Sequence, residues 1–278
     1  RRQRQMCIRD RLFTVCWWEQ RGSGISYSRK VTKETMTIGQ MIEDATAVTN
    51  YLRRRFGKEK IYVLGHSWGS VLGVLTVQKS PELFHGYIGI GQVVCQSKSE
   101  CLAYSFMVNE FTAAGDRKML RRLEKFPIDR GGEVSFQYLA VRSVGMMKLG
   151  IGIMHHLDSM SDCIKIVLRY KGYTLKDKLH FVMGSGLALK CLWDFVMQTD
   201  FVKQVPHLEI PVYIFQGRFD YQVSYSLAKE FADTVKAPVK GFYTFENSAH
   251  SPCFEEPKKM CHIIREDVLQ GKCGLADG

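Results

Sequence analysis

A serine flanked by glycines, in the run Gly-His-Ser-Trp-Gly at residues 65–69, constrains the fold of this chain more than any other feature. The run "KIYVLG" before it is short, apolar and rich in β-branched and aromatic residues, which is typical of a buried strand. The run "SVLGVLTVQKS" after it predicts a helix that ends at Pro81. A serine held between a strand and a helix predicts a cramped turn that pushes its hydroxyl outward.

This pattern, Gly-x-Ser-x-Gly between a strand and a helix, is the nucleophile elbow. We therefore predict that Ser67 is a nucleophile at the carboxyl edge of a sheet, close to a helix N-terminus that favours negative charge. The glycines are expected because side chains at residues 65 and 69 would collide with the neighbouring strand and helix. The alternative is an ordinary turn serine. The pentapeptide alone does not exclude it, so the prediction depends on the strand and helix around it.

Strands and helices alternate on both sides of this turn. Apolar runs throughout, rather than alternating ones, predict a parallel sheet covered on both faces. Thr37 and Gln40 have the spacing of a capping box, and Gly57 is expected to close the helix that they begin. The expected strands are residues 12–18, 60–65, 86–94, 211–217 and 241–246, and the expected helices are 38–56, 70–80, 224–235 and 255–270.

Long helical patterns replace the strands between about residues 97 and 204. We predict four segments from this change. They are a non-native or disordered leader at 1–11, the first part of the core at 12–96, a helical cap insertion at 97–204 and the second part of the core at 205–278.

A serine nucleophile needs a histidine base and an acid that orients it. Asp220 follows the strand at 211–217 and His250 follows the strand at 241–246, in the order this fold requires. The alternatives are a turn or capping aspartate and a loop histidine. Glu246 could replace Asp220 but lies at a strand end, and His66 is expected to pack. The adjacent His155 and His156 would face apart on a helix, which argues against a metal site.

Composition narrows the class of protein. Five arginines against one aspartate in residues 1–11 supply +4 of the net charge of +11, and the rest forms no basic stripe, so we expect no nucleic-acid partner. No apolar run reaches the ~18 residues of a membrane span, so no membrane partner is expected. The nine cysteines have no zinc-site spacing, which predicts reduced thiols in a cytoplasmic protein without a metal.

The chain resembles the α/β-hydrolase superfamily and its proline iminopeptidase-like branch in three blocks of sequence. These are "WWEQRGSGISYS", "GHSWGS" and the pair "FQGRFDYQV" with "ENSAHSPCFEEP". Glu19 stands where the branch usually has aspartate. The resemblance implies a mostly parallel sheet with an inserted helical cap, and a Ser67, Asp220 and His250 triad. It also implies an oxyanion hole to which Trp68 donates its backbone N–H.

Two features depart from this resemblance. The upstream His-Gly-Gly-Pro-Gly-like loop, which would supply a second oxyanion donor, has no counterpart in the sequence. The superfamily also places three strands before the one that precedes "EQRG". We therefore expect an N-terminally truncated sheet in which the strand at 12–18 either pairs directly with 60–65 or leaves a gap.

The expected function is a serine hydrolase that cleaves an acyl bond without a cofactor. The resemblance implies an aminopeptidase that releases N-terminal proline from a short peptide. Small-ester hydrolysis is the alternative, and a non-catalytic binding protein is a third, because the oxyanion loop is missing. The resemblance also implies cap carboxylates that hold a substrate amino group. Solvated helix faces are the better interpretation of the candidates Asp158, Asp162, Asp194 and Asp200.

Overall fold

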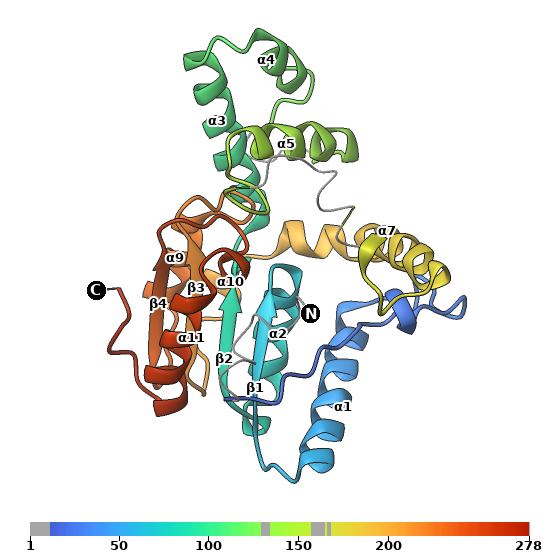
Figure 1. Ribbon diagram of the computed structural model, residues 1–278, viewed down its shortest axis with the longest axis vertical. Coiled ribbons are helices and arrows are strands. Elements are labelled where there is room, and N and C mark those ends of the chain that lie inside the picture. Colours follow the sequence, from blue (N-terminus) through green and yellow to red (C-terminus); the bar gives the residue numbers. More distant parts are fainter. Residues whose placement is uncertain (1–11, 129–133, 157–164, 166–167, 278) are drawn as a thin grey trace.

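The core is a sheet of four parallel strands in the order β1-β2-β3-β4, in a computed structural model that describes residues 12–128, 134–156, 165 and 168–277. Leu64 pairs with Ile88, and Phe215 pairs with both Ile90 and Tyr243 across the sheet. The loops that follow the strands therefore meet at one edge (Figure 1). The strands are β1 (Ile61–His66), β2 (Phe84–Ile90), β3 (Val212–Gly217) and β4 (Lys240–Phe245).

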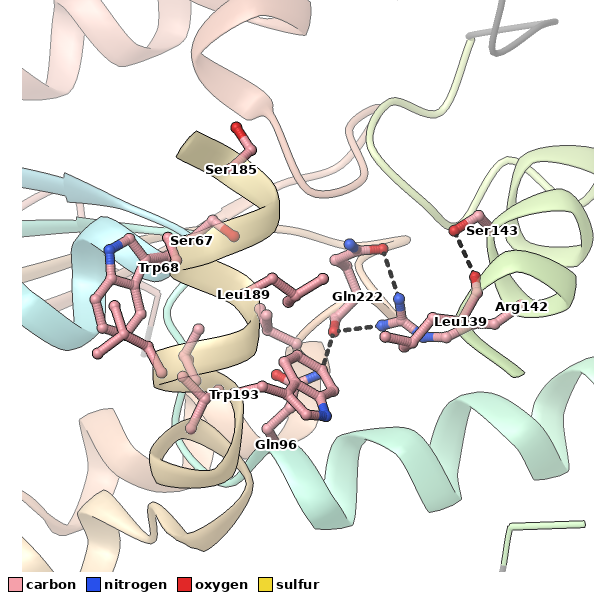
Figure 2. Close-up of a pocket in the computed structure, with 15 residues that line it drawn as sticks. Ser67, Trp68, Gln96, Leu139, Arg142, Ser143, Ser185, Leu189, Trp193 and Gln222 are labelled. Carbon is pink, nitrogen blue, oxygen red and sulfur yellow. Dashed lines mark hydrogen bonds between the residues drawn. The ribbon is translucent and has the colours of Figure 1, made fainter. Parts of the chain in front are cut away.

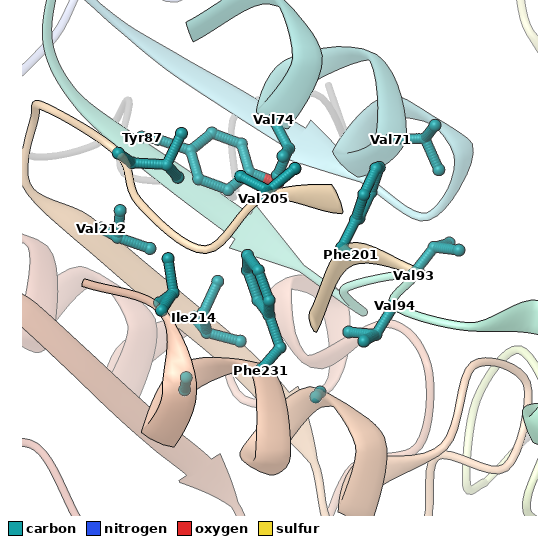
Figure 3. Close-up of a cluster of buried hydrophobic side chains, with 14 of the residues drawn as sticks. Val71, Val74, Tyr87, Val93, Val94, Phe201, Val205, Val212, Ile214 and Phe231 are labelled. Atoms are coloured by element: carbon teal, nitrogen blue, oxygen red, sulfur yellow. The ribbon is translucent and has the colours of Figure 1, made fainter. Parts of the chain in front are cut away.

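Both faces of the sheet are covered, as predicted. On one face, Tyr87, Val212 and Ile214 pack against α2 (Trp68–Lys79), α8 (Phe201–Gln204) and α9 (Tyr225–Thr234) (Figure 3). On the other face, Tyr213 and Phe215 pack against α10 (Pro252–Glu255) and α11 (Pro257–Glu266). Successive residues of a strand point to opposite faces, so burial on both faces requires apolar residues throughout. The observed architecture is a parallel sheet with helices on both faces.

The first long helix begins and ends where the sequence predicts. In α1 (Ile38–Phe56), the Thr37 hydroxyl accepts a hydrogen bond from the Gln40 backbone N–H at 3.2 Å, and Gly57 closes the helix at φ 58°. The predicted strand at 86–94 begins earlier and stops at Ile90, because Gly91 turns the chain at φ 53°. The predicted helix at 255–270 is divided into α10, α11 and the short η5 (Val268–Gln270), since Glu256 precedes a proline and leaves the helical conformation.

The chain between β2 and β3 forms the helical region, which we define as residues 96–204. Its helices, in the part that the structure describes, are α3 (Gln96–Ala113), α4 (Arg117–Leu123), α5 (Phe136–Lys148), α7 (Leu175–Gln198) and α8. Figure 1 shows α3, α4, α5 and α7 beyond the carboxyl ends of the strands, whereas α8 packs on one face of the sheet. Met107, Leu123 and Met146 belong to a separate apolar cluster that joins α3, α4 and α5. This region therefore has packing of its own above the edge at which the strand loops meet.

The expected strand at residues 12–18 is absent, and this prediction is wrong. The segment has no regular secondary structure, and Phe13 packs edge-on against Tyr62 of β1 with ring centroids 5.5 Å apart. Trp18 instead joins the cluster that contains Met36 and Met41. Aromatic and β-branched residues here serve packing rather than strand pairing, since strand propensity depends on context. Among the described residues, β1 pairs only with β2. The leader predicted at 1–11 lies outside the described residues.

One helix of the described chain, α7, has the length and apolar composition of a membrane-crossing helix. A helix that packs within a protein can meet the same criteria. Leu192 and Val196 of α7 are buried in two of the apolar clusters of this molecule.

Candidate active site

Ser67 lies in the strained turn that joins β1 to α2. Its backbone adopts φ 56° and ψ −123°, one of two positive φ values among the described residues other than glycine. Such a conformation costs roughly 1–3 kcal/mol and persists only where surrounding contacts enforce it. Here the Ser67 N–H donates to the Ile90 carbonyl at 3.0 Å, and the Ser70 hydroxyl donates to the Ser67 carbonyl at 2.6 Å. The strand end and the first helical turn together hold the elbow.

The two glycines of the elbow differ in their steric role. A Cβ atom at Gly65 would collide with the backbone carbonyl of Gly69, as the sequence predicts. A Cβ atom at Gly69 would meet nothing within 4 Å, so the prediction of a collision at that position is wrong. The close approach is therefore made by the strand side of the turn, where β1 passes under the start of α2.

Asp220 and His250 come together as a hydrogen-bonded pair from the loops after β3 and β4. The His250 Nδ1 lies 2.9 Å from the Asp220 Oδ2, and both side chains are buried. Asp220 Oδ2 also accepts a hydrogen bond from the Gln216 side-chain amide at 2.6 Å. Its Oδ1 accepts from the backbone N–H groups of Gln222 and Val223 at 2.8 and 3.2 Å. An ionised carboxylate is an acceptor only, so it can satisfy these four donors at once.

This pairing leaves the other nitrogen of the imidazole available. Because Asp220 accepts from Nδ1, that nitrogen carries a proton, and in the neutral imidazole Nε2 then has a lone pair. Nε2 is buried and has no hydrogen-bond partner within the part of the chain that the structure describes. The Ser67 hydroxyl therefore makes no hydrogen bond to it in this structure. A nitrogen in this state can accept a proton from a nearby group.

The His250 ring is nevertheless held next to the serine turn. A Cβ atom at Gly91 would lie 2.7 Å from the His250 Nδ1, so the chain after β2 passes directly against the imidazole. His66, which precedes the serine, places its Nε2 at 2.9 Å from the His250 carbonyl oxygen. The rings of His66 and His250 are 5.0 Å apart. Gly91, after β2, and His66, at the end of β1, thus hold His250 against the elbow.

His66 is a neutral support of this arrangement. Burial, with a smaller effect of the neighbouring His250, lowers the pKa of His66 from 6.5 to about 4. A neutral imidazole can donate one N–H, and the His250 carbonyl is the acceptor within reach. His66 thus holds the backbone of His250 rather than merely packing.

Trp68 begins α2, and the first N–H groups of a helix have no acceptor within that helix. Its indole N–H donates to the Gln20 side chain at 2.9 Å. Glu19 accepts from the Tyr173 hydroxyl and from the Ile25 N–H, both at 2.6 Å. The "EQRG" block thus ties the segment before α1 to the elbow helix and to the helical region.

A cavity of about 410 Å³ opens beside Ser67, between the core and the helical region (Figure 2). Its walls come mainly from α5 and α7, from the elbow and from the loop after Asp220. Most of the lining is apolar, and Arg142 is the one charged residue that lines it among the residues that the structure describes. The lining residues are Ser67, Trp68, Val93, Gln96, Leu139, Arg142, Ser143, Ser185, Ala188, Leu189, Leu192, Trp193, Val196, Gln222 and Val223.

The four candidate aspartates, for which solvated helix faces are the better interpretation, do not line this cavity where the structure describes them. Asp194 is exposed on α7, and Asp200 forms an ion pair with Lys203 at 3.0 Å. Asp158 and Asp162 lie outside the described residues. Within the described chain, no group of three or more His, Cys, Asp or Glu side chains is arranged to hold a metal ion.

Several site residues were missed by the sequence reasoning. Gln216 carried a usable signal, because it is a polar residue inside an otherwise apolar buried strand. No local signal in the sequence identifies the other residues, since their roles depend on contacts between distant segments. They are Gly91, Gln222 and the pair Glu100 and Arg142.

Comparison with known proteins agrees with this architecture. The sequence family described as "Serine aminopeptidase, S33" matches residues 8–257. The chain is 33% identical over 255 residues to "Probable aminopeptidase YbaC" of Bacillus subtilis (strain 168), covering 92% of this chain and 80% of that protein. It is 23% identical over 263 residues to a "Proline iminopeptidase" of Saccharolobus solfataricus, covering 92% of this chain and 76% of that one.

Solved structures show the same fold. A proline iminopeptidase-related protein from Thermus thermophilus superposes with a TM-score of 0.57 at 19% identity, over 95% of this chain and 82% of that one. The proline iminopeptidase of Mycobacterium smegmatis gives a TM-score of 0.57 at 13% identity, over 88% and 75% of the two chains. The chain belongs to the serine aminopeptidase S33 family and is an α/β hydrolase of the proline iminopeptidase-like kind.

Proposed function

We propose that this protein is a serine hydrolase that cleaves an acyl bond with Ser67, His250 and Asp220. The observation that carries the proposal is the buried Asp220–His250 hydrogen bond, which leaves Nε2 without a partner near a serine in a strained elbow. A movement of the serine side chain or of the imidazole that brings the two groups within hydrogen-bond reach would make the nucleophile–base hydrogen bond. Such bonds are often long before substrate binds.

In this mechanism His250 accepts the Ser67 proton through Nε2 while the serine oxygen attacks the substrate carbonyl. Asp220 keeps the proton on Nδ1 and stabilises the imidazolium that forms. The Trp68 backbone N–H stabilises the oxyanion, a contribution of roughly a hundred- to a thousandfold for one donor. His250 then returns the proton to the leaving group, and water hydrolyses the acyl-enzyme by the reverse sequence of proton transfers.

The relatives' names favour a peptide bond after an N-terminal residue, proline in particular. Ester hydrolysis is the second candidate, and the mostly apolar lining of the cavity beside Ser67 favours it. Both reactions use the same acyl-enzyme, so the proposed roles of the three residues do not depend on the choice.

A fluorophosphonate probe tests the proposal directly, since it reacts with an activated serine. We expect labelling of the folded protein that is lost in Ser67→Ala. The matched control is Ser105→Ala, an exposed serine on α3, which should label like the unaltered protein. Absence of labelling in a folded protein would contradict the proposal and favour a non-catalytic binding protein instead.

A further inference from the structure

Glu255 is the last residue of α10, the short helix that follows His250. Its Oε2 accepts a hydrogen bond at 2.9 Å from the backbone N–H of Ala249, the residue before the base. Ala249 and His250 are both buried, so this N–H is shielded from water and needs an acceptor within the protein. The Glu255 carboxylate therefore fixes the backbone that carries the imidazole.

The other oxygen of the same carboxylate reaches the helical region. Glu255 Oε1 accepts from the backbone N–H of His155 at 2.7 Å and from that of His156 at 3.4 Å. An ionised carboxylate is an acceptor only, so it can satisfy all three N–H groups at once, and such hydrogen bonds are stronger than those between neutral groups. Glu255 thus joins the loop after β4 to a segment that lies 100 residues away in the sequence.

This segment, residues 150–156, also contacts the loops of the base and the acid directly. The His250 N–H donates to the Gly152 carbonyl at 3.1 Å. The N–H of Tyr221, the residue after Asp220, donates to the Ile151 carbonyl at 3.2 Å. Two loops that leave neighbouring strands are therefore hydrogen-bonded to the same short stretch of the helical region.

The backbone of the 150–156 segment is closely fitted around His155. The His155 Nδ1 lies 2.8 Å from the Gly150 carbonyl oxygen, and the ring stacks on Phe219 with the centroids 3.9 Å apart. Gly150 has a φ of 65°, and a Cβ atom there would lie 2.7 Å from the His155 carbonyl oxygen. One added methyl group at residue 150 would therefore displace the backbone whose N–H groups Glu255 accepts.

We propose that Glu255 is a positioning residue, which holds His250 in place by joining the loop after β4 to the 150–156 segment. His250 is then fixed beside the elbow only while this segment is docked at the strand ends. Because the segment follows α5, which lines the cavity, it connects the cavity wall to the base. The inference rests on the proposed function, since it explains how the base of that function is aligned.

The rate at which a fluorophosphonate labels Ser67 tests this role, because the reaction needs a correctly placed base. Glu255→Ala removes both acceptor oxygens, and a misplaced base should lower the rate constant of labelling by about 10²-fold. Glu255→Gln retains one acceptor oxygen, since its amide nitrogen cannot accept from an N–H, and should lose only about tenfold.

The matched control is Glu230→Ala, which removes an exposed glutamate on α9 and should label at the rate of the unaltered protein. A rate for Glu255→Ala within about twofold of the unaltered protein would overturn the inference.

Steady-state kinetics separates positioning from loss of stability. With p-nitrophenyl acetate, at a temperature at which circular dichroism shows each variant to be folded, kcat and kcat/KM should fall equally in Glu255→Ala. KM should stay unchanged, because the lost contact acts through the proton transfer. A lower content of folded protein with an unchanged kcat per folded molecule would show a merely structural role and overturn the inference.

A second variant tests the connection from the side of the helical region and leaves Glu255 unaltered. Gly150→Ala presses on the His155 backbone and should lower the labelling rate by about tenfold. Gly115→Ala is its matched control, since Gly115 has a φ of 67° and a Cβ atom there meets nothing within 4 Å. Equal labelling rates in these two variants would overturn the role of the 150–156 segment.

The labelling results also separate the two proposals. Labelling of Ser67 that does not change in Glu255→Ala would overturn this inference and leave the serine hydrolase intact. Absence of labelling in the folded, unaltered protein would overturn the proposed function, and this inference with it.

Discussion

The strand-end loops and the helical region contribute to one site in different ways. At the strand ends, Ser67, Asp220 and His250 are positioned by backbone hydrogen bonds and by close approach of the main chain. In the helical region, the cavity wall is positioned by side-chain packing and by the buried Glu100–Arg142 ion pair. The difference implies that the three strand-end residues are fixed by the edge of the sheet, whereas the side chains of the cavity wall can change without moving that edge.

The largest expected effect comes from the acid at the strand ends. Asp220→Asn keeps the shape but replaces an acceptor by an amide, so His250 can adopt the tautomer with its proton on Nε2. We expect kcat to fall by roughly 10⁴-fold, as for an acid that orients a catalytic histidine. Steady-state kinetics with a short-chain ester measures this. Nearly unchanged kcat in a folded variant would show that Asp220 does not orient the base.

A smaller effect is expected from the backbone that touches the imidazole. Gly91→Ala would place a Cβ atom 2.7 Å from His250 Nδ1 and strain a residue at φ 53°. Displacing the ring by a fraction of an ångström to an ångström should lower kcat/KM by about 10²-fold, which steady-state kinetics with the same ester measures.

Gly57→Ala is the matched control for this variant. Gly57 also has a positive φ, 58°, but a Cβ atom there meets nothing within 4 Å. It should lose about 1 kcal/mol of stability without loss of activity. Equal loss of activity in the two variants would show that strain, not contact with His250, is responsible.

The smallest effect concerns the neutral histidine beneath the base. The folded-state pKa of His66 is about 4 against 6.5 for the ordinary side chain, so the unfolded chain binds its proton first as the pH falls. Its contribution to stability is therefore present above about pH 6.5 and lost as the pH falls toward 4. Between pH 7 and pH 5, the contribution of His66 to the free energy of unfolding should fall by about 2 kcal/mol.

Urea unfolding at the two pH values measures this contribution. His66→Gln removes the titrating group and retains an N–H donor for the His250 carbonyl. In His66→Gln, the loss of unfolding free energy between pH 7 and pH 5 should be smaller by about 2 kcal/mol. If the free energy of unfolding depends on pH in the variant as in the unaltered protein, groups other than His66 cause that dependence.

Much of the strand-end region could be predicted because its signals are local. The elbow, the loop aspartate and the loop histidine each follow an apolar strand, and parallel strands bring their carboxyl ends to one edge. Thr37 and Gly57 likewise predicted the ends of α1, since capping is a short-range hydrogen-bond pattern.

The errors arose where burial and strand pairing give the same residue composition. Residues 12–18 are aromatic and β-branched because Phe13 and Trp18 pack against Tyr62 and the α1 cluster, and the segment joins no strand. The collision expected at Gly69 was wrong because only the strand side of the elbow approaches the helix closely.

The sequence by itself determined the order of the parallel elements, the strained serine turn and the candidate residues Ser67, Asp220 and His250. These depend on periodicity and on turn chemistry that act over a few residues. Only the tertiary structure decided that Glu100 is neutralised by Arg142, 42 residues further along the chain, and that the cavity wall is apolar. The physical reason is that an ion pair between two helices, and the wall that it completes, depend on how those helices pack, which no local pattern encodes.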